Sequence, residues 1–253
     1  MGAVIFSDVH ADATAIGGLV SCIQTPEFIT CFGPVDELVN LGDLVHRGNY
    51  PKETLETIHQ VKEQYPLNSV LGNHDHAFLN GIIVSGSDAA SSYRHEQLRN
   101  SPLLSILDGV PMDWVHNGML FVHGGPLELG NQTLRLKCWQ RLSHDYGDFF
   151  TGYHYTASMA FKALEARGVT HMCCGHQHQN VCCRKTPDGI VQHRLDFQPI
   201  LMITNGAMQT SLEVATVPLD VPSILRVGSC HGNVPEFAYT DFSRFSFIRM
   251  RGV

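Results

Sequence analysis

Seven side chains of metal-ligand type stand in five short segments that lie far apart along the 253-residue chain. They are two aspartates, one asparagine and four histidines: Asp8, His10, Asp43, Asn73, His123, His176 and His178. Carboxylate, amide and imidazole groups together suit divalent ions of intermediate hardness, such as manganese, iron, zinc and nickel. Seven ligands are too many for one tetrahedral zinc ion, and none of them is a cysteine. The set instead suits two ions about 3.5–4 Å apart that share one carboxylate.

Each of these segments directly follows a short apolar run that indicates a buried strand. The expected strands are 3–6, 38–41, one that ends at 70–71, 120–122 and 169–174. Because ligands bind outside the carboxyl ends of strands in open α/β sheets, the five strand ends can meet at one pocket. A lone histidine after a strand is more often a hydrogen-bonded surface residue, but five such segments in order favour a metal site.

Helical patterns separate the first three strands. Asp12 is placed to cap a helix that carries Ala15 to Ile23, and Pro51 suits the first turn of the next helix. This alternation of strands and helices implies a parallel sheet. Further on, we expect a helix over 155–166, a helical patch around 134–142, a hairpin turn at 187–189 and short strands over 190–195, 200–204, 238–241 and 245–250. No shift in composition marks a boundary, so we expect one domain over 1–253.

In chain order, the five segments resemble the five motifs of the calcineurin-like metallophosphoesterases. They are Ser-Asp8-Val-His10, Gly42-Asp43-Leu-Val-His-Arg47-Gly48, Gly72-Asn73-His74-Asp75, Val-His123-Gly-Gly and Gly175-His176-Gln-His178. The tail segment Val227-Gly228-Ser229, followed by short strands, is similar to small prokaryote-type members. The resemblance implies an α/β (α+β) fold: a four-layer αββα sandwich of two mixed β-sheets flanked by helices. It also implies a dimetal site at the C-terminal ends of the strands.

The resemblance assigns each ligand to an ion. Asp8, His10 and His178 would bind the first ion, and Asn73, His123 and His176 the second, while Asp43 would bridge both. Manganese is the expected metal, and iron, zinc, nickel and magnesium are the other candidates. With His74 as general acid toward the leaving oxygen and Arg47 on the phosphate, the catalytic residues would be His74, Arg47 and Asp43. Arg47, Asn73 and His74 would bind the substrate.

One position departs from the protein phosphatase branch of this family. His46 stands where that branch has an aspartate that pairs with the catalytic histidine. We therefore expect this pairing to be absent here, or to be partly taken over by Asp75. Arg47 is shared with protein phosphatases and dinucleoside polyphosphate hydrolases, whereas many small phosphodiesterase-like members lack it.

These residues predict a metal-dependent phosphoesterase. It would hydrolyse phosphate esters or phosphoanhydrides by in-line attack of a metal-bridging hydroxide. The expected partner is a small phosphorylated substrate, either a phosphomonoester or a nucleotide. A dinucleoside polyphosphate such as diadenosine tetraphosphate, or a Ser/Thr phosphoprotein, is the alternative. A non-catalytic metal-binding scaffold of the same fold is the non-enzymatic alternative, but lost ligands would mark such a protein and all seven are present.

Composition and cysteine content limit the class of protein and the cellular compartment that we expect. A chain with 43% hydrophobic and 16% charged residues is not disordered, and a net charge of −7 argues against general nucleic-acid binding. No run of 18 apolar residues predicts a membrane span, and the N-terminus lacks the pattern of a signal peptide. The eight cysteines are expected to be reduced, mostly buried thiols of a cytoplasmic protein. In each of the pairs Cys173-Cys174 and Cys182-Cys183, one cysteine should pack between the sheets. The sequence leaves the oligomeric state open.

A polar segment over 85–102 lies between the strand ends that bear Asn73 and His123. It contains Tyr93, Arg94 and His95. Since both of its ends are tied near the expected metals, we predict that it borders the pocket and selects the substrate, with Arg94 facing a distal phosphate. A solvated surface excursion is the alternative.

Overall fold

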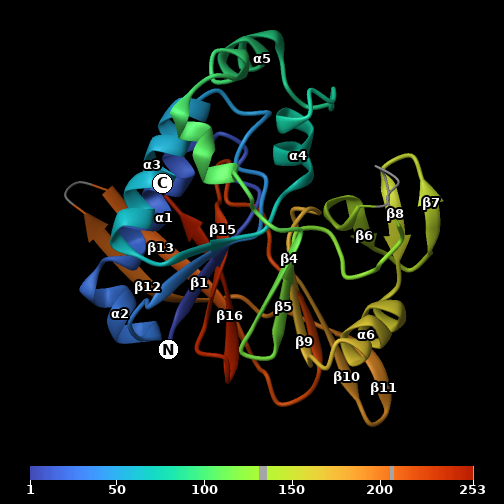
Figure 1. Cartoon of the computed structure of the whole chain (residues 1–253). Helices are drawn as coiled ribbons and strands as arrows, with labels where there is room; N and C mark the ends of the chain where they lie inside the picture. Colours follow the sequence, from blue (N-terminus) through green and yellow to red (C-terminus); the bar gives the residue numbers. More distant parts are fainter. Residues whose placement is uncertain (131–135, 206–207, 253) are drawn as a thin grey trace.

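The computed structural model describes residues 1–130, 136–205 and 208–252 (Figure 1). Its helices are α1 (Ala13–Ile23), α2 (Pro26–Phe32), α3 (Pro51–Gln64), α4 (Asn73–Leu79), α5 (Ala89–Glu96) and α6 (Ala157–Ala166). Two short 3-10 turns cover Pro102–Leu107 and Lys137–Trp139. Three of the helices begin at an expected type of residue: Asp12 caps α1 through its side chain, and α2 and α3 each start with a proline.

The first sheet has seven strands and is mixed. Its order is β12 (Gln198–Asn205), β13 (Met208–Pro218), β16 (Arg244–Arg251), β15 (Glu236–Thr240), β1 (Ala3–Phe6), β2 (Glu37–Asn40) and β3 (Leu67–Ser69). The strands β1, β2 and β3 run parallel, whereas β15 pairs with β1 in the antiparallel sense. The carboxyl ends of β1, β2 and β3 therefore lie along one edge of this sheet.

The second sheet has six strands and is also mixed. Its order is β11 (Gly189–His193), β10 (Val181–Thr186), β14 (Ser223–Arg226), β9 (His171–Cys174), β5 (Met119–Val122) and β4 (Asp113–His116). The central strands β14, β9 and β5 are parallel. A third, small sheet joins β6 (Gln140–Leu142), β8 (Gly152–Tyr155) and β7 (Gly147–Phe149). This third sheet was not expected from the sequence.

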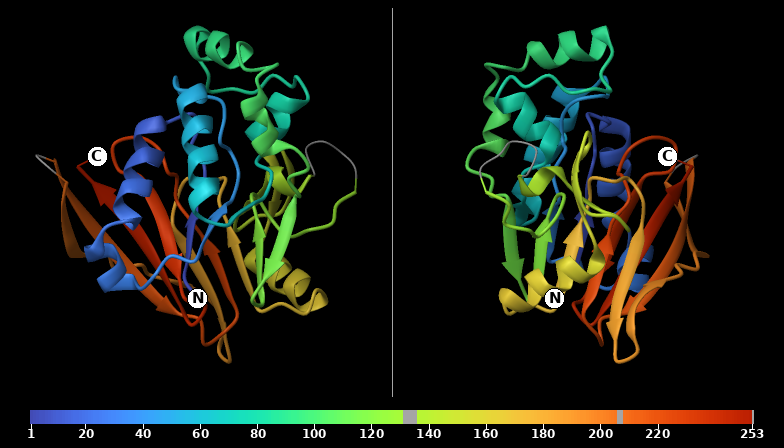
Figure 2. Two further views of the ribbon diagram at one scale, coloured as in Figure 1. Left: turned by 60° about the vertical axis from the view of Figure 1, so that its left-hand side comes forward. Right: turned by 90° about the vertical axis from the view of Figure 1, so that its right-hand side faces the viewer.

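Three apolar clusters hold the layers together. The cluster between the two large sheets includes Ile5 of β1 and Phe247 of β16 on one side and Phe121 of β5 on the other. A second cluster packs α1, α2 and α3 on the outer face of the first sheet. A third places Phe161 of α6 on the outer face of the second sheet. The order is thus helices, sheet, sheet, helix (Figure 2), which confirms the expected four-layer αββα sandwich.

Burial explains why two of the strands before the site, β1 and β5, are continuously apolar. All four residues of β1 are buried, with Val4 and Phe6 facing the helices and Ile5 facing the other sheet. A strand covered on both faces has no exposed side to make polar, so it loses the alternation of a half-buried strand.

Several elements differ from the sequence-based expectation. The third strand is Leu67–Ser69, so it ends before Val70 and Leu71. The segment over 85–102 contains the helix α5 rather than only loop. Of the helical patch expected around 134–142, residues 134 and 135 lie outside the described part of the chain. The remainder forms the turn Lys137–Trp139 and the strand β6. The turn at 187–189 is confirmed, because it joins the antiparallel strands β10 and β11.

The cysteines behave as expected. All eight are free thiols, and only Cys31 is exposed. Cys173 and Cys182 lie in the cluster between the two large sheets, while their neighbours Cys174 and Cys183 face α6. Neighbouring residues of a strand point to opposite faces, which is why each adjacent pair divides between two clusters.

The helices were also compared with the length of a membrane span. Within the described ranges, no single helix is long and apolar enough to cross a bilayer. The helices α1 and α2 meet that criterion only as a pair bent by 71°. Both helices contribute buried residues to the cluster on the outer face of the first sheet.

Candidate metal centre

The loops after four strands and the start of α4 meet at one edge of the sandwich. Backbone hydrogen bonds tie the loops to one another: the amide of Asp8 donates to Gly42 O at 2.9 Å, and that of His10 donates to Asp43 O at 2.9 Å. Across the two sheets, the amide of His176 donates to Asp8 Oδ2 at 2.9 Å. The five segments singled out in the sequence are therefore brought together.

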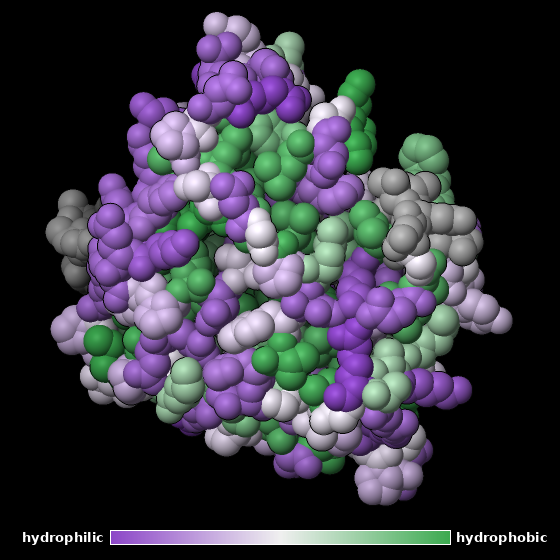
Figure 3. Space-filling view, in the orientation of Figure 1, coloured by the Kyte–Doolittle hydropathy of each residue, from purple (hydrophilic) through white to green (hydrophobic). Residues whose placement is uncertain are grey.

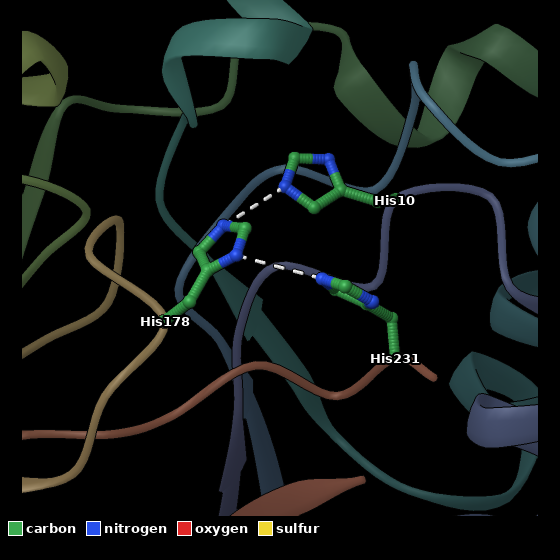
Figure 4. A group of neighbouring side chains, drawn as sticks. All are labelled: His10, His178 and His231. Carbon is green, nitrogen blue, oxygen red and sulfur yellow. Dashed lines mark hydrogen bonds between the residues drawn. The ribbon is translucent and has the colours of Figure 1, made fainter. Parts of the chain in front are cut away.

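A first group of ligand atoms comes from the loops after β1 and β9. The Nε2 atoms of His10 and His178 lie 3.1 Å apart, and His178 Nε2 lies 3.1 Å from Asp8 Oδ1. His10 Nε2 is 3.7 Å from the same carboxylate oxygen. Figure 4 shows the rings of His10 and His178 turned toward each other. Three ligand atoms from two sheets thus face one small volume.

A second group comes from the loops after β5 and β9 and from the first residue of α4. His123 Nε2 is 2.9 Å from Asn73 Oδ1 and 3.3 Å from Asp43 Oδ2. The rings of His123 and His176 lie 5.0 Å apart. The ligand atoms of Asp43, His123 and His176 are all within 4.8 Å of one another.

Asp43 stands between the two groups. Its Oδ2 atom is 3.3 Å from His123 Nε2 and 3.9 Å from His10 Nε2. Its Oδ1 atom accepts the backbone N–H of His74 at 2.8 Å, which fixes the orientation of the carboxylate. One oxygen of Asp43 is thereby directed at the space between the groups.

The unpaired atoms of this cluster fit divalent cations. Asp8 Oδ1 and His176 Nε2 are buried and accept no hydrogen bond from the described residues, although buried polar atoms are ordinarily satisfied. His123 Nδ1 lies 2.7 Å from Leu41 O and so carries its proton there, which leaves the lone pair of Nε2 facing the centre. The donor set of nitrogen and oxygen atoms is one that such ions prefer.

The backbone at the centre is strained. Asp8, His10, Asp43, His176 and His178 all have positive φ angles, between 49° and 68°. Such angles are uncommon for residues other than glycine, and they persist where the surrounding structure holds them. Five of the seven proposed ligands share this conformation, which turns each side chain sharply away from its strand.

Two glycines let the loops after β2 and β3 touch. A Cβ atom on Gly72 would lie 2.1 Å from the amide nitrogen of Asp43. Gly42 has φ of +98°, and a Cβ atom there would lie 2.4 Å from Gly72 N. Because any side chain at either position would separate the loops, these glycines bring Asp43 and Asn73 to the same centre.

Burial and charge act on the titratable groups in opposite directions. Burial alone would raise the pKa of Asp8, but the neighbouring His178 and His123 hold it below its ordinary value. Burial would likewise lower the pKa of His123, yet the adjacent Asp43 raises it to about 9. Burial lowers the pKa of His10 to about 3. Without a cation, a proton on His123 balances the carboxylates.

His74 and Arg47 lie beside this cluster. Arg47 Nη2 is 3.1 Å from His74 Nε2. Burial lowers the pKa of His74; Asp43 opposes this effect and Arg47 adds to it. One ring nitrogen of His74 also lies within 4.8 Å of a ligand atom of His10 and of Asp43.

Asp75 does not take the place of the aspartate that pairs with the catalytic histidine in protein phosphatases. Its carboxylate accepts the backbone N–H groups of Asp43, Leu44 and Val45 at 2.7–3.2 Å. His74 Nδ1 is buried and has no hydrogen-bond partner within the described ranges. Of the two outcomes expected from the sequence, the structure shows the first: among the described residues no carboxylate pairs with His74, and Asp75 instead shapes the loop after β2.

His231 belongs to the centre and was missed in the sequence. Its Nε2 atom lies 3.5 Å from His178 Nδ1, and Figure 4 shows its ring facing His178. Two hydrogen bonds fix its loop: Cys230 N donates to Ser7 O at 2.8 Å, and Gly232 N donates to Asp12 Oδ2 at 2.9 Å. The available signal was the buried strand β14 (Ser223–Arg226) shortly before it, whose end is a strand end like the other five.

Two adjoining pockets open next to the centre. The first has about 310 Å³ and is lined by His10, Arg47, Tyr50 and His231 among others. The second has about 530 Å³, shares Asn49 and Tyr50 with the first, and is lined by Lys52 and Arg94. The segment over 85–102 thus borders the pocket region through Arg94, whereas its role in selecting the substrate stays a prediction.

The fold and the site define an α/β protein of two mixed sheets with a histidine and aspartate cluster for divalent cations at the strand ends. The sequence profile of the calcineurin-like phosphoesterases matches residues 1–180, and the chain belongs to this family. This confirms the resemblance of the five motifs. Family membership and the clustered ligands together support metal-dependent hydrolysis of phosphoric esters.

Solved structures share the fold over nearly the whole chain. A metallophosphoesterase from Sphaerobacter thermophilus is 22% identical, with a TM-score of 0.66 over 98% of this chain and 87% of its own. A protein serine/threonine phosphatase from Saccharomyces cerevisiae with similarity to human phosphatase PP5 is 12% identical, with a TM-score of 0.60 over 100% of this chain and 80% of its own. A putative diadenosine tetraphosphatase is 14% identical, with a TM-score of 0.52 over 98% and 93%. No curated protein sequence matches the chain.

Proposed function

We propose that this chain is a dinuclear metallohydrolase that cleaves the phosphoric ester or anhydride bond of a small phosphorylated substrate, a phosphomonoester or a nucleotide. The observation that carries the proposal is the position of Asp43. Its Oδ2 atom faces His10 Nε2 on one side and His123 Nε2 on the other, at 3.9 and 3.3 Å. A carboxylate between two groups of ligands is what two ions about 3.5–4 Å apart require.

The ligands divide between two ions as the family resemblance implies. Asp8, His10 and His178 would hold the first, and Asn73, His123 and His176 would hold the second. When bound, the two ions supply positive charge to the phosphoryl oxygens and an activated water as nucleophile. Manganese is the metal we propose, because the mixed set of carboxylate, amide and imidazole donors suits it.

The chain itself orients the substrate and moves a proton. Arg47 lines the pocket beside the centre, and a guanidinium group can bind two phosphoryl oxygens through parallel N–H donors. His74 lies next to Arg47, and it would be the general acid that protonates the leaving oxygen once its Nε2 atom is released from Arg47. The buried surroundings strengthen these interactions, because water does not screen them.

Dinucleoside polyphosphates are a second candidate substrate class. The pocket beside the centre continues into the one lined by Lys52 and Arg94, with the exposed ring of Tyr50 between them. Two cations beyond Arg47 suit further phosphates, and an exposed aromatic ring suits a base. We further propose a cytoplasmic setting, because all eight cysteines are free thiols.

The test combines turnover with metal content. The protein is freed of metal, reloaded with manganese and assayed against monoesters, diesters and dinucleoside polyphosphates. We expect roughly two ions per chain and turnover of at least one class. Asp43→Asn should lose most activity and weaken both ions, because the bridge loses its charge, whereas the exposed Asp145→Asn should change neither. One tightly bound zinc ion per chain, unchanged in Asp43→Asn, contradicts the proposal.

A further inference from the structure

The loop that carries Arg47 is held by side chains from the segment over 86–95. Three successive residues of the loop are bound through their backbone: the N–H of His46 by His95 Nε2 at 2.7 Å, the N–H of Arg47 by Ser87 Oγ at 2.8 Å, and the carbonyl of Gly48 by Ser91 Oγ at 2.8 Å. These hydrogen bonds join residues 40 to 49 positions apart in the chain. We call the three donors and acceptors, Ser87, Ser91 and His95, the clamp.

The loop needs such support because its backbone is strained. His46 and Arg47 have φ angles of 69° and 66°, in the left-handed region that favours glycine. A conformation of this kind persists only where neighbours fix it. Two of the three clamp bonds end on the amides of these two residues, so the clamp acts where the strain lies.

The geometry of His95 is consistent with a fixed acceptor. Its side chain is buried, and its Nδ1 atom lies 2.8 Å from Ser91 O, so the ring proton is on that nitrogen. Nε2 then carries a lone pair, which is what the N–H of His46 requires. Burial lowers the pKa of His95, which keeps the ring neutral.

The same segment also packs on the side chain of Arg47. A Cβ atom on Gly86 would lie 3.0 Å from Arg47 Nε and 3.2 Å from its Cγ. Arg47 Nε is buried and has no hydrogen-bond partner among the described residues, while Nη2 lies 3.1 Å from His74 Nε2. The guanidinium is therefore held in place by packing on one side, and Arg47 lines the pocket beside the centre.

We propose that Ser87, Ser91 and His95 are positioning residues, which fix the loop over 46–48 so that the Arg47 guanidinium stands where a phosphoryl group binds. This inference rests on the proposed function, since it assumes that Arg47 binds phosphate. It assigns the segment over 86–95 a part in the reaction that differs from contact with the substrate. Figure 3 shows that polar side chains gather over the top of the molecule, where α5 lies; the clamp residues Ser91 and His95 lie on its buried side.

The experiment measures the affinity of the manganese-loaded protein for inorganic phosphate by calorimetry, together with kcat and KM. Ser87→Ala and Ser91→Ala should each weaken phosphate binding roughly 10-fold, because a small misplacement of a positioned group is costly. The matched control is Ser92→Ala on the same helix. Its hydroxyl donates to Asp88 O and does not touch the loop, so this variant should bind phosphate like the wild type.

A double-mutant cycle distinguishes a role in positioning Arg47 from a merely structural role. In an Arg47→Ala background, Ser87→Ala and Ser91→Ala should change phosphate affinity less than about twofold, since the group they position is gone. His95→Gln, which can still accept from His46 N, should retain more phosphate affinity than His95→Ala. Metal content should be unchanged in all of these variants.

Equal losses of phosphate affinity in the wild-type and Arg47→Ala backgrounds would overturn the proposal, as would wild-type affinity in both serine variants. Phosphate binding can be compared even if no substrate is turned over. If the proposed function is wrong, the wild type turns over no substrate. If the clamp proposal is wrong, the serine variants bind phosphate like the wild type, or they lose the same affinity with and without Arg47.

Discussion

His74 is oriented by its neighbours on both the backbone and the side chain. Its N–H donates to Asp43 Oδ1 at 2.8 Å, and its Nε2 lies 3.1 Å from Arg47 Nη2. Its position near His10 and Asp43 allows either of two roles, a ligand of an ion or a general acid. The two roles predict different behaviour on substitution.

We expect His74→Asn to retain its metal and to lose roughly 10²–10⁴ in rate on substrates with poor leaving groups. The loss should be smaller for p-nitrophenyl phosphate, because its leaving group needs little protonation. Metal analysis and the rates on both kinds of substrate check this. A fall in metal content would instead identify His74 as a ligand, and equal losses on both substrates would exclude proton donation.

His231 is placed to orient a metal ligand. With His178 Nε2 directed at Asp8 and His10, the proton of His178 lies on Nδ1, which faces His231 Nε2 at 3.5 Å. A second hydrogen-bond partner of this kind fixes the tautomer and the direction of a ligating histidine. We therefore expect His231→Ala to weaken the binding of one manganese ion roughly 10–100-fold.

Calorimetric titration of the metal-free protein with manganese measures this effect. His193→Ala, which removes an exposed histidine from β11, is the matched control and should bind metal like the wild type. If His231→Ala leaves both dissociation constants unchanged and only raises KM, His231 contacts the substrate rather than supporting the ligand.

At the scale of elements, strands supply the framework and the loops after them supply the chemistry. The parallel strands β1, β2 and β3 place three loops on one edge, and β5 and β9 place two more opposite them. The loops are strained at the ligands and are held by neighbours such as Asp75, which accepts three backbone N–H groups of the loop after β2. The helix α5 extends this framework toward the second pocket.

Arg94 is the exposed part of α5 that faces this second pocket. Its Nη1 donates to Asn49 O at 2.9 Å, and its guanidinium lies 5.9 Å from the centre of the Tyr50 ring. Arg94→Ala should raise KM for a dinucleoside polyphosphate about 10-fold and leave KM for p-nitrophenyl phosphate unchanged, because only the longer substrate extends beyond the metals.

Steady-state kinetics on both substrates check this prediction for Arg94. Tyr93→Ala is the control, since Tyr93 is exposed on the same helix and does not line this pocket. Wild-type constants for Arg94→Ala on every substrate would show that this part of α5 is only surface.

At the scale of the whole molecule, the metal centre couples folding to pH. The pKa of His123 is raised from 6.5 to about 9 by Asp43, in spite of burial. A histidine whose pKa is raised in the folded state stabilises the fold fully below pH 6.5, and this contribution is lost as the pH rises through 9. In the metal-free protein, the contribution of His123 alone, about 3 kcal/mol, should therefore be lost between these values.

Manganese should reverse this trend, because it binds the unprotonated Nε2 atom and displaces the proton. Thermal unfolding of the metal-free and manganese-loaded protein between pH 6.5 and 9 measures both effects. In His123→Gln, the metal-free protein should lack this part of the pH dependence. A Tm for the metal-free wild type that follows that of His123→Gln over this range would refute the coupling.

The local sequence was sufficient for the framework of the site. The runs over 3–6, 38–41 and 120–122 predicted buried strands, because a strand covered on both faces is mostly apolar. The polar residues after them predicted which loops carry the proposed ligands, because these segments lie at or shortly after the strand ends. The four layers followed from the family resemblance and are confirmed by the three apolar clusters.

Only the tertiary structure placed His231 and the clamp. His231 reaches His178 because β14 pairs in parallel with β9, so their carboxyl ends lie at the same edge, and such pairing between distant segments leaves no local pattern. The contacts of Ser87, Ser91 and His95 with the Arg47 loop likewise span 40 residues or more. Side-chain types determined the chemistry available to this protein, whereas long-range pairing and packing decided which of those side chains meet.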